Sequence, residues 1–279
     1  MSVDVIKDEY WQRQEPKEPA LFKGVDLMPP EQKKFAGNFL VLGGRAGAFF
    51  TVMKTAEELR AQKVASVEVF LPDSLKKVLP AKLENVAFLP SERAGGFAGE
   101  LSKETLTKVQ DKDAVILAGD LGKGKASEAL ALAFLQRAPK QQCFFAARDA
   151  VEVLTARAQV VFAQQERELF LLLTKAQLKK LFEALYFPRI VALTTPLIQM
   201  VEIVHKFGLS YPRVTLITVV EGQVLLAQNG QVVTLPLTMT PWNLLSIWDG
   251  EALARMAAIR VWNKTQVGLQ AVAMALVVR

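Results

Sequence analysis

Cysteine and histidine are nearly missing from this sequence. Its 279 residues include one cysteine, Cys143, and one histidine, His205. A single cysteine excludes an internal disulfide, and a single histidine excludes a histidine-rich metal site and disfavours a histidine-based catalytic triad. Both residues stand in apolar stretches, so we interpret Cys143 as a small buried hydrophobe and His205 as a structural imidazole. No metal site is predicted from the scattered acids.

Long apolar runs and basic stripes are missing as well. No window approaches about eighteen uninterrupted apolar residues. The start of the chain carries Asp4, Lys7, Asp8 and Glu9 and lacks a secretory signal. These absences predict a soluble cytoplasmic protein with no membrane partner. The net charge of +6 comes from basic residues spread among acidic ones, so nucleic-acid binding is not predicted.

The most informative stretch runs from residue 113 to 136. An apolar run at 114–118 meets a glycine-rich turn and then an apolar helical pattern, which predicts strand, loop and helix. The turn contains Gly119, Asp120, Gly122 and Gly124. Because a helix N-terminus exposes free backbone N–H groups, and Lys123 and Lys125 stand beside it, the loop is a candidate phosphate cradle. The alternative is an ordinary turn with solvated lysines, since the spacing matches neither GxxxxGK[ST] nor GxGxxG.

The chain divides into an arm and one domain. Residues 1–36 are charged and contain prolines, which predicts an extended arm that packs on the domain or on a neighbouring subunit. Residues 37–279 form the predicted domain. Its first part alternates strands at 38–43, 66–71, 84–89, 114–118, 142–146 and 158–163 with helices at 48–62, 102–110 and after residue 125.

This alternation predicts a mostly parallel sheet with helices on both faces. Ligands in such sheets bind beyond the carboxyl ends of the strands. The loops at Gly43, Gly119, Arg148 and Gln164 should therefore surround one crevice.

The last third of the chain has a different pattern. Alternating stretches at 213–220, 223–228 and 231–235 are separated by Glu221-Gly222 and Asn229-Gly230, which are turn signals. They predict antiparallel strands that complete the sheet. Helices are predicted at 176–186 and 196–207 before these strands, and at 251–262 and 267–277 after them.

Three turns of this sequence look like turns of a known family. Gly43-Gly44-Arg45 is similar to its Gly-Gly-Ser turn, 118–122 to its Gly-Pro-Gly-Leu-Gly loop, and 147–151 to its Asp-Ala-Asp-Ala-Leu segment. The sequence thus resembles the ribokinase-like superfamily over about residues 36–279, and within it the ADP/ATP-dependent NAD(P)H-hydrate dehydratase branch. The resemblance implies a three-layer α/β/α sandwich whose mostly parallel central sheet ends in antiparallel strands. It also implies ADP or ATP with Mg²⁺, hydrated NADH or NADPH as substrate, and a homo-oligomer, either a dimer or a tetramer.

The sequence departs from the family where catalysis takes place. Of the family's Thr-Pro-His-x-x-Glu segment only Glu168 is kept, and the nucleotide-phosphate lysine falls at Val219. The Gly-Thr-Gly-Asp anion hole falls at Trp248-Asp249-Gly250-Glu251. Such a hole needs glycine's freedom to close backbone N–H groups on an anion, so a tryptophan and a carboxylate oppose it. The resemblance implies Glu251 as the candidate acid or base and nucleotide contacts at Gly43, Gly44, Gly119, Asp120, Gly122, Lys123, Lys125, Glu168, Asp249 and Gly250.

Each of the altered residues also has a purely structural interpretation. Asp249 and Glu251 fit a solvated helix N-terminus, where acids favour the macrodipole. Trp248 is expected to plug the nucleotide crevice or to pack on the sheet, rather than to stack on adenine.

Three functions stay open. We favour a degenerate member that binds a nucleotide or dinucleotide without turnover, a pseudoenzyme. An active dehydratase or small-molecule kinase would use Glu251 as the acid or base and Lys123 or Lys125 in place of the missing lysine. A structural or partner-binding scaffold would use apolar helix surfaces near 169–173 and 269–276 as subunit contacts.

Overall fold

The strands join into a single sheet. The structure is a computed structural model that describes residues 9–79, 84–99, 102–122, 124–137, 139–163 and 166–277. In this part of the chain ten strands pair in the order β1-β10-β9-β8-β7-β6-β5-β2-β3-β4. Their bounds are β1 Trp11–Arg13, β2 Asn38–Gly43, β3 Ser66–Pro72, β4 Val86–Leu89, β5 Ala114–Gly119, β6 Cys143–Ala147, β7 Leu169–Leu172, β8 Val214–Val220, β9 Gln223–Gln228 and β10 Gln231–Pro236. Pairing is parallel from β4 to β8 and antiparallel from β8 through β9 to β10, which confirms the predicted sheet.

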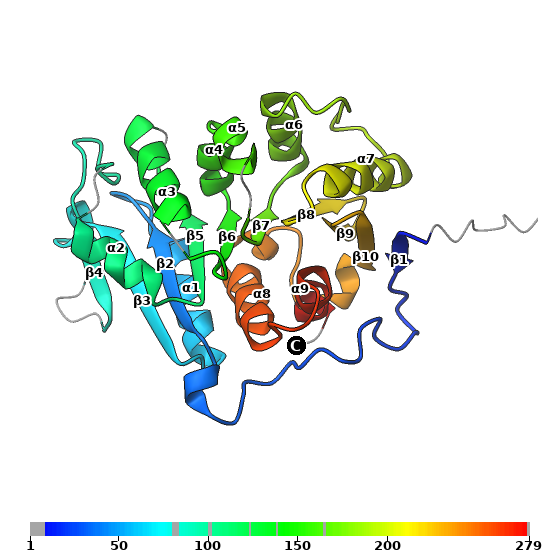
Figure 1. Cartoon of the computed structure of the whole chain (residues 1–279), viewed down its shortest axis with the longest axis horizontal. Coiled ribbons are helices and arrows are strands. Elements are labelled where there is room, and N and C mark those ends of the chain that lie inside the picture. The colour runs from blue at the N-terminus through cyan, green and yellow to red at the C-terminus, as the bar shows by residue number, and fades with distance from the viewer. Residues whose placement is uncertain are drawn as a thin grey trace, which may run out of the picture.

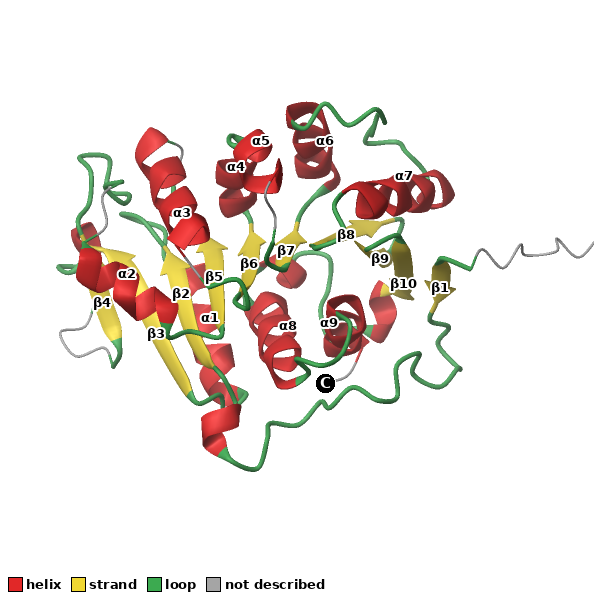
Figure 2. Ribbon diagram, viewed as in Figure 1, coloured by secondary structure: helices red, strands yellow, loops and turns green. Residues whose placement is uncertain are grey.

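Helices cover both faces of this sheet (Figure 1). They are α1 Phe50–Ala61, α2 Lys103–Gln110, α3 Lys125–Arg137, α4 Asp149–Thr155, α5 Ala158–Ala163, α6 Lys175–Ala184, α7 Leu197–Ser210, α8 Glu251–Trp262 and α9 Gly268–Val277. The first face carries α2 to α7, and the second carries α1, α8 and α9. The predicted three-layer α/β/α sandwich is confirmed. Figure 2 shows how strands and helices alternate to build it. No helix in these described ranges is long and apolar enough to cross a membrane.

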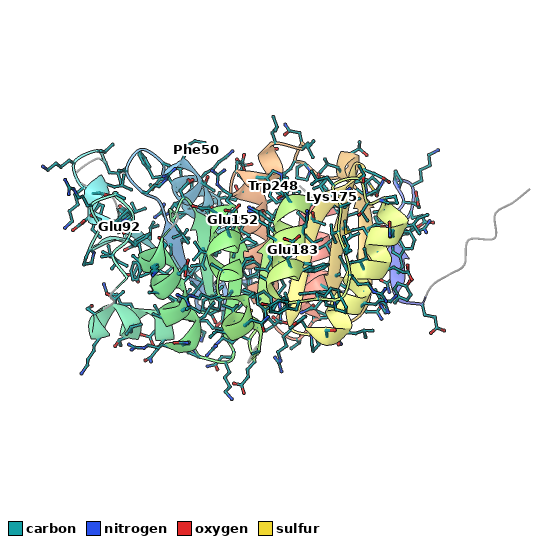
Figure 3. All side chains as sticks on the ribbon, turned by 90° about the horizontal axis from the view of Figure 1, so that it is seen from above. Phe50, Glu92, Glu152, Lys175, Glu183 and Trp248 are labelled. Atoms are coloured by element: carbon teal, nitrogen blue, oxygen red, sulfur yellow. The ribbon has the colours of Figure 1, made fainter. Side chains whose placement is uncertain are left out.

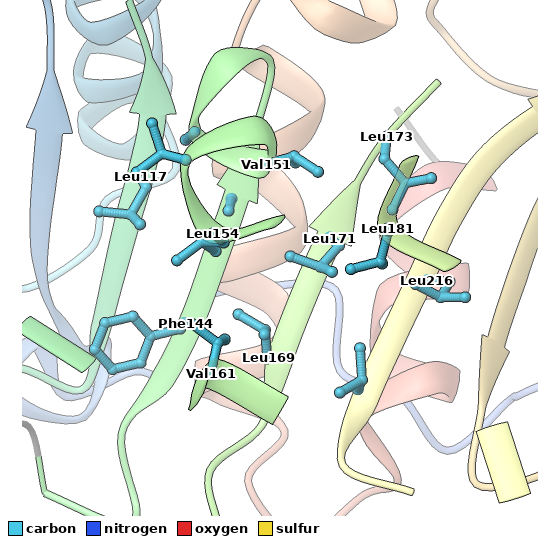
Figure 4. Close-up of a cluster of buried hydrophobic side chains, with 14 of the residues drawn as sticks. Leu117, Phe144, Val151, Leu154, Val161, Leu169, Leu171, Leu173, Leu181 and Leu216 are labelled. Atoms are coloured by element: carbon cyan, nitrogen blue, oxygen red, sulfur yellow. The ribbon is translucent and has the colours of Figure 1, made fainter. Parts of the chain in front are cut away.

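Two apolar clusters hold the layers together, one on each face of the sheet. On the first face, Leu117 and Phe144 of adjacent strands lie under Leu154 of α4 (Figure 4). Because successive strand residues point to opposite faces, Phe145 and Phe170 belong to the other cluster, where their stacked ring centroids are 4.4 Å apart. The central strands are continuous apolar runs in sequence since both of their faces are buried.

The predicted hairpin turns are confirmed at the backbone level. Glu221 and Gly222 have φ angles of 50° and 72°, and Asn229 and Gly230 have φ angles of 47° and 74°. Two consecutive residues with positive φ match the twist of antiparallel strands.

One predicted strand is wrong. Residues 158–163 form α5, and the strand lies later in the chain, at β7 (Leu169–Leu172). The buried residues of α5 are Ala158, Val161 and Phe162, which is the spacing of a helix face. Short apolar runs fit either element, and here tertiary packing decided between them. The apolar helix surface expected near 169–173 is therefore a buried strand.

The N-terminal arm belongs to the same structural unit as the sheet and helices. Its strand β1 pairs in parallel with β10, and the arm then passes along α9 and α8 to a 3-10 helix at Lys33–Phe35 (Figure 1). The side-chain amide of Asn263, at the end of α8, accepts a hydrogen bond from the Asp26 N–H and donates one to the Asp26 carbonyl, both at 2.8 Å. Apolar residues of the arm, among them Leu21 and Phe22, pack against the second cluster. The arm thus covers part of α8 and α9, two helices most of whose residues are buried.

Candidate functional site

The two glycine loops predicted from the sequence meet at the centre of the sheet. The chain runs from β2 outward to β4, and β5 then returns to the other side of β2, so the topological switch point lies between β2 and β5. Here the Gly44 N–H donates to the Gly119 carbonyl over 3.0 Å. A Cβ on Gly43 would lie 2.3 Å from the same oxygen. Gly43 is therefore required by the close approach of the two strand ends.

A crevice of about 500 Å³ opens beside this point, beyond the carboxyl ends of the strands. Its lining residues come from four loops and are Arg45, Glu92, Ala94, Gly96, Asp120, Gly122, Arg148 and Asp149. The volume lies within the usual range for small-molecule sites. The structure thus brings Asp120 and Gly122 of the predicted set into one crevice, next to Gly43, Gly44 and Gly119.

One wall of the crevice is an ion pair on strained backbone. The Arg148 guanidinium lies 3.1 Å from an Asp120 carboxylate oxygen, and the two residues have φ angles of 56° and 57°. Left-handed backbone at a non-glycine residue costs about 1–3 kcal/mol and is typical of functional sites. The Gly122 N–H donates to Asp149 Oδ2 over 3.1 Å, and Asp149 begins α4, where a carboxylate favours the helix dipole.

Two charged side chains in the crevice are unpaired. Arg45 and Glu92 are exposed, and neither makes an ion pair within the described residues. The full lining carries two arginines and three carboxylates. Such a mixture suits a ligand that presents both an anionic group and hydroxyl donors.

Of the two predicted lysines, the structure describes only Lys125. Lys123 lies outside the described residues. Lys125 is exposed at the first position of α3 and does not line the crevice. The loop before α3 is instead held by the Ser127 hydroxyl, which donates to the Leu121 carbonyl over 2.7 Å.

The N-terminus of α8 is closed by an ion-pair cluster. Lys54 of α1 lies 2.5 Å from Asp249 Oδ2 and 2.9 Å from Glu251 Oε1, and Asp249 Oδ1 accepts a hydrogen bond from the Glu251 N–H over 3.2 Å. The hydrogen bond that Lys54 donates to Asp249 raises the pKa of Lys54, and burial opposes this shift. Two carboxylates therefore stand at the N-terminus of α8, beside the exposed N–H groups of its first turn.

Gly250 is required by helix packing in this structure. Its φ is 107°, and a Cβ there would lie 2.4 Å from Thr55 Oγ1 and 2.8 Å from the Thr51 carbonyl oxygen. The end of α8 is thus pressed against α1. Trp248, just before it, is half-buried and packs on the second apolar cluster. In Figure 3, Trp248 and Phe50 lie toward the same edge of the molecule.

Glu168 does not join the crevice. It precedes β7 and therefore lies at the amino end of the strands, the opposite end of the sheet. Its carboxylate is 2.7 Å from Arg260 Nε and accepts a hydrogen bond from the Cys143 thiol over 3.4 Å. The sequence places Glu168 after a strand at 158–163. Because the strand begins at Leu169 instead, Glu168 lies away from the crevice residues with which the prediction grouped it.

Several residues of the crevice and of the ion-pair cluster at α8 were assigned no role from the sequence. Lys54, Glu92 and Asp149 belong to this group, although Asp149 follows a buried strand, which is a usable signal. Within the described ranges, no group of three or more histidine, cysteine or acidic side chains could hold a metal ion.

Comparisons with known proteins bear on the fold. No protein-family model and no curated protein sequence matches this chain. A solved ribokinase-like superfamily protein from Enterococcus faecalis aligns with a TM-score of 0.66 at 12% identity, covering 96% of this chain and 86% of that one. The ADP/ATP-dependent NAD(P)H-hydrate dehydratase from Bacillus subtilis, co-crystallised with ATP and Mg²⁺, aligns with a TM-score of 0.57 at 12% identity, covering 89% and 81%. Ribokinase from Cryptococcus neoformans, in complex with ADP, aligns with a TM-score of 0.55 at 13% identity, covering 86% and 91%. This chain has the ribokinase-like fold.

Proposed function

We propose that this protein binds a nucleotide or dinucleotide in the switch-point crevice without turning it over. The observation that carries the proposal is the position of the crevice between the ends of β2 and β5. On its wall lies Arg45, which makes no ion pair with any residue that the structure describes. Open α/β sheets bind their ligands at this point. The Bacillus subtilis and Cryptococcus neoformans proteins of the same fold were crystallised with ATP and ADP, which supports a nucleotide as the ligand.

The charges of the crevice match the parts of such a ligand. A phosphate group would pair with Arg45 and draw Arg148 from Asp120. Ribose hydroxyls would donate to the carboxylates of Glu92 and Asp149. Hydrated NADH or NADPH, the substrate of the dehydratase branch that this sequence resembles, carries both phosphates and ribose hydroxyls.

Turnover is not expected because the catalytic end of the family site is altered. Transition-state charge needs preorganised N–H donors or cations facing it. At the N-terminus of α8, two carboxylates face Lys54 instead, so their net charge repels a phosphate oxyanion. The position of the family's phosphate lysine is Val219, within β8.

Ligand binding is tested by thermal unfolding with ADP, ATP and NADPH, with and without Mg²⁺. A ligand at a hundredfold excess over its Kd stabilises the native state by about 2.7 kcal/mol, which raises Tm by roughly 5–10 °C for a chain of this size. Arg45→Ala should abolish the shift. Arg137→Ala removes an exposed arginine from the far end of α3 and should retain it. No shift with any ligand would contradict the proposal.

Turnover is tested separately. Hydrated NADH is mixed with the protein and ADP or ATP, and absorbance at the NADH band is followed beside a working dehydratase. We expect no recovery of absorbance. Recovery that Glu251→Gln abolishes would show an active dehydratase, and binding without turnover would be wrong.

A further inference from the structure

A second cavity, of about 660 Å³, lies at the amino ends of the central strands. Its walls include the starts of β2, β5 and β6, the end of α2, and the last turn of α8 with the residues after it. It is therefore at the opposite end of the sheet from the switch-point crevice. The lining carries three carboxylates, Asp111, Asp113 and Glu168, and six cations, which are Lys34, Lys112, Lys140, Arg213, Arg260 and Lys264.

Three of these cations are neutralised by carboxylates. Lys112 lies 2.9 Å from Glu68, Lys140 lies 2.6 Å from Glu166, and Lys264 lies 2.6 Å from Asp113. Lys112 and Lys264 also follow the carboxyl ends of α2 and α8, where cations offset the helix dipole. These three need no ligand to explain them.

The other three cations leave binding capacity unused. Lys34 and Arg213 are exposed and make no ion pair within the described residues. Arg260 is only 7% exposed, and its Nε donates to Glu168 over 2.7 Å while Nη1 donates to the Asn263 carbonyl over 2.6 Å. Its third nitrogen, Nη2, makes no hydrogen bond in the described structure. Nη2 keeps solvent-accessible surface where Arg260 lines the cavity, so its N–H groups are free to donate to a ligand oxygen.

From this arrangement we infer a second binding site, for a small phosphorylated anion, in the amino-end cavity. Arg260 Nη2 donates to a phosphate oxygen, and the exposed Lys34 and Arg213 pair with the remaining charge. The Glu168 carboxylate holds the Arg260 guanidinium in place for this contact. The site is independent of the crevice, since none of these residues lines it.

The test uses inorganic pyrophosphate and the full chain carrying Arg45→Ala, which disables the phosphate position of the crevice. Isothermal titration at low salt should give saturable binding that weakens as salt is added. Arg213→Glu or Lys34→Glu should each weaken the affinity about tenfold, because each loses a charge-assisted contact. Lys33→Glu and Arg189→Glu change the net charge equally at residues outside the cavity. They should leave the affinity within about twofold.

Three outcomes would overturn the inference. The first is no binding of pyrophosphate at millimolar concentration. The second is equal weakening by the control reversals, which would assign the effect to overall charge. The third is unchanged affinity in both rim variants. Every protein in this experiment carries Arg45→Ala, so none of these results tests the proposal that the crevice binds a nucleotide. Conversely, a loss of nucleotide binding in Arg45→Ala does not test the amino-end cavity.

Discussion

Gly250→Ala is the substitution that best separates packing from anion binding at the N-terminus of α8. If this turn formed an anion hole, the glycine would serve a ligand. In the structure it serves the contact between α8 and α1, because a Cβ would lie 2.8 Å from the Thr51 carbonyl oxygen and 2.4 Å from Thr55 Oγ1. The Thr55 hydroxyl cannot turn away cheaply, since it donates to the Thr51 carbonyl over 2.7 Å.

The expected loss of stability has two parts. A residue with a side chain at φ 107° costs about 1–2 kcal/mol. Forcing a methyl group against fixed backbone costs about 1–3 kcal/mol more. The sum is about 2–5 kcal/mol, which corresponds to a fall in Tm of roughly 5–15 °C.

Denaturant unfolding of wild type, Gly250→Ala and Gly222→Ala gives the free energies of unfolding that separate the backbone cost from the packing cost. Gly222 also has a positive φ, 72°, but nothing lies within 4 Å of its Cβ position, so its alanine variant shows the backbone cost alone. We expect Gly250→Ala to lose at least about 1 kcal/mol more than this control. Equal losses would refute the packing argument. Below both melting transitions, ADP binding should be unchanged in Gly250→Ala, and its loss would place the phosphates at α8 instead of at the crevice.

Three further perturbations probe the arm, the buried thiol and the ion-pair cluster. Gln14 donates to the carbonyls of residues 15, 18 and 19 and accepts from the Leu21 N–H, so Gln14→Ala should speed tryptic cleavage of the arm, followed by mass spectrometry, whereas exposed Gln12→Ala should not. Burial raises the pKa of the Cys143 thiol from 9.0 to about 12. Its stabilisation is therefore present below pH 9 and lost as the pH rises toward 12, at up to about 1.4 kcal/mol per pH unit. Denaturant unfolding at pH 9 and 11 should show a smaller loss in Cys143→Ala, and an equal loss would exclude this thiol as the cause. Lys54→Met should lower the unfolding free energy by about 1 kcal/mol at low salt and by less at high salt, because the pairs are partly exposed; a loss independent of salt would contradict this.

Local signals predicted most of the fold. The Gly43 and Gly119 turns follow buried strands as expected, and the hairpin turns at Glu221-Gly222 and Asn229-Gly230 have the required backbone. These features depend on residues close in sequence, whose periodicity and backbone preferences can be read directly. The prediction of a strand at 158–163 was wrong because a short apolar run is compatible with both a buried strand and one face of a helix.

The candidate site was less accessible to sequence reasoning. The glycines, Asp120 and Gly122 were found because each follows a strand. Lys54 was not, since its partner Asp249 is 195 residues away and no local pattern links α1 to α8. The predicted position of Glu168 was wrong because the strand was expected before it in the chain, whereas β7 follows it. Glu168 therefore lies at the other end of the sheet.

By itself, the sequence determined an alternating α/β chain with a parallel sheet, antiparallel final strands and an arm, because hydrophobic period and turn chemistry act within a few residues. Only the tertiary structure decided that the crevice lies between β2 and β5, that α1 packs too close to Gly250 for a side chain there, and that Arg260 lines a second cavity. These properties arise from the order of strands and from contacts between distant segments. Side chains acquire such neighbours only when the whole chain packs.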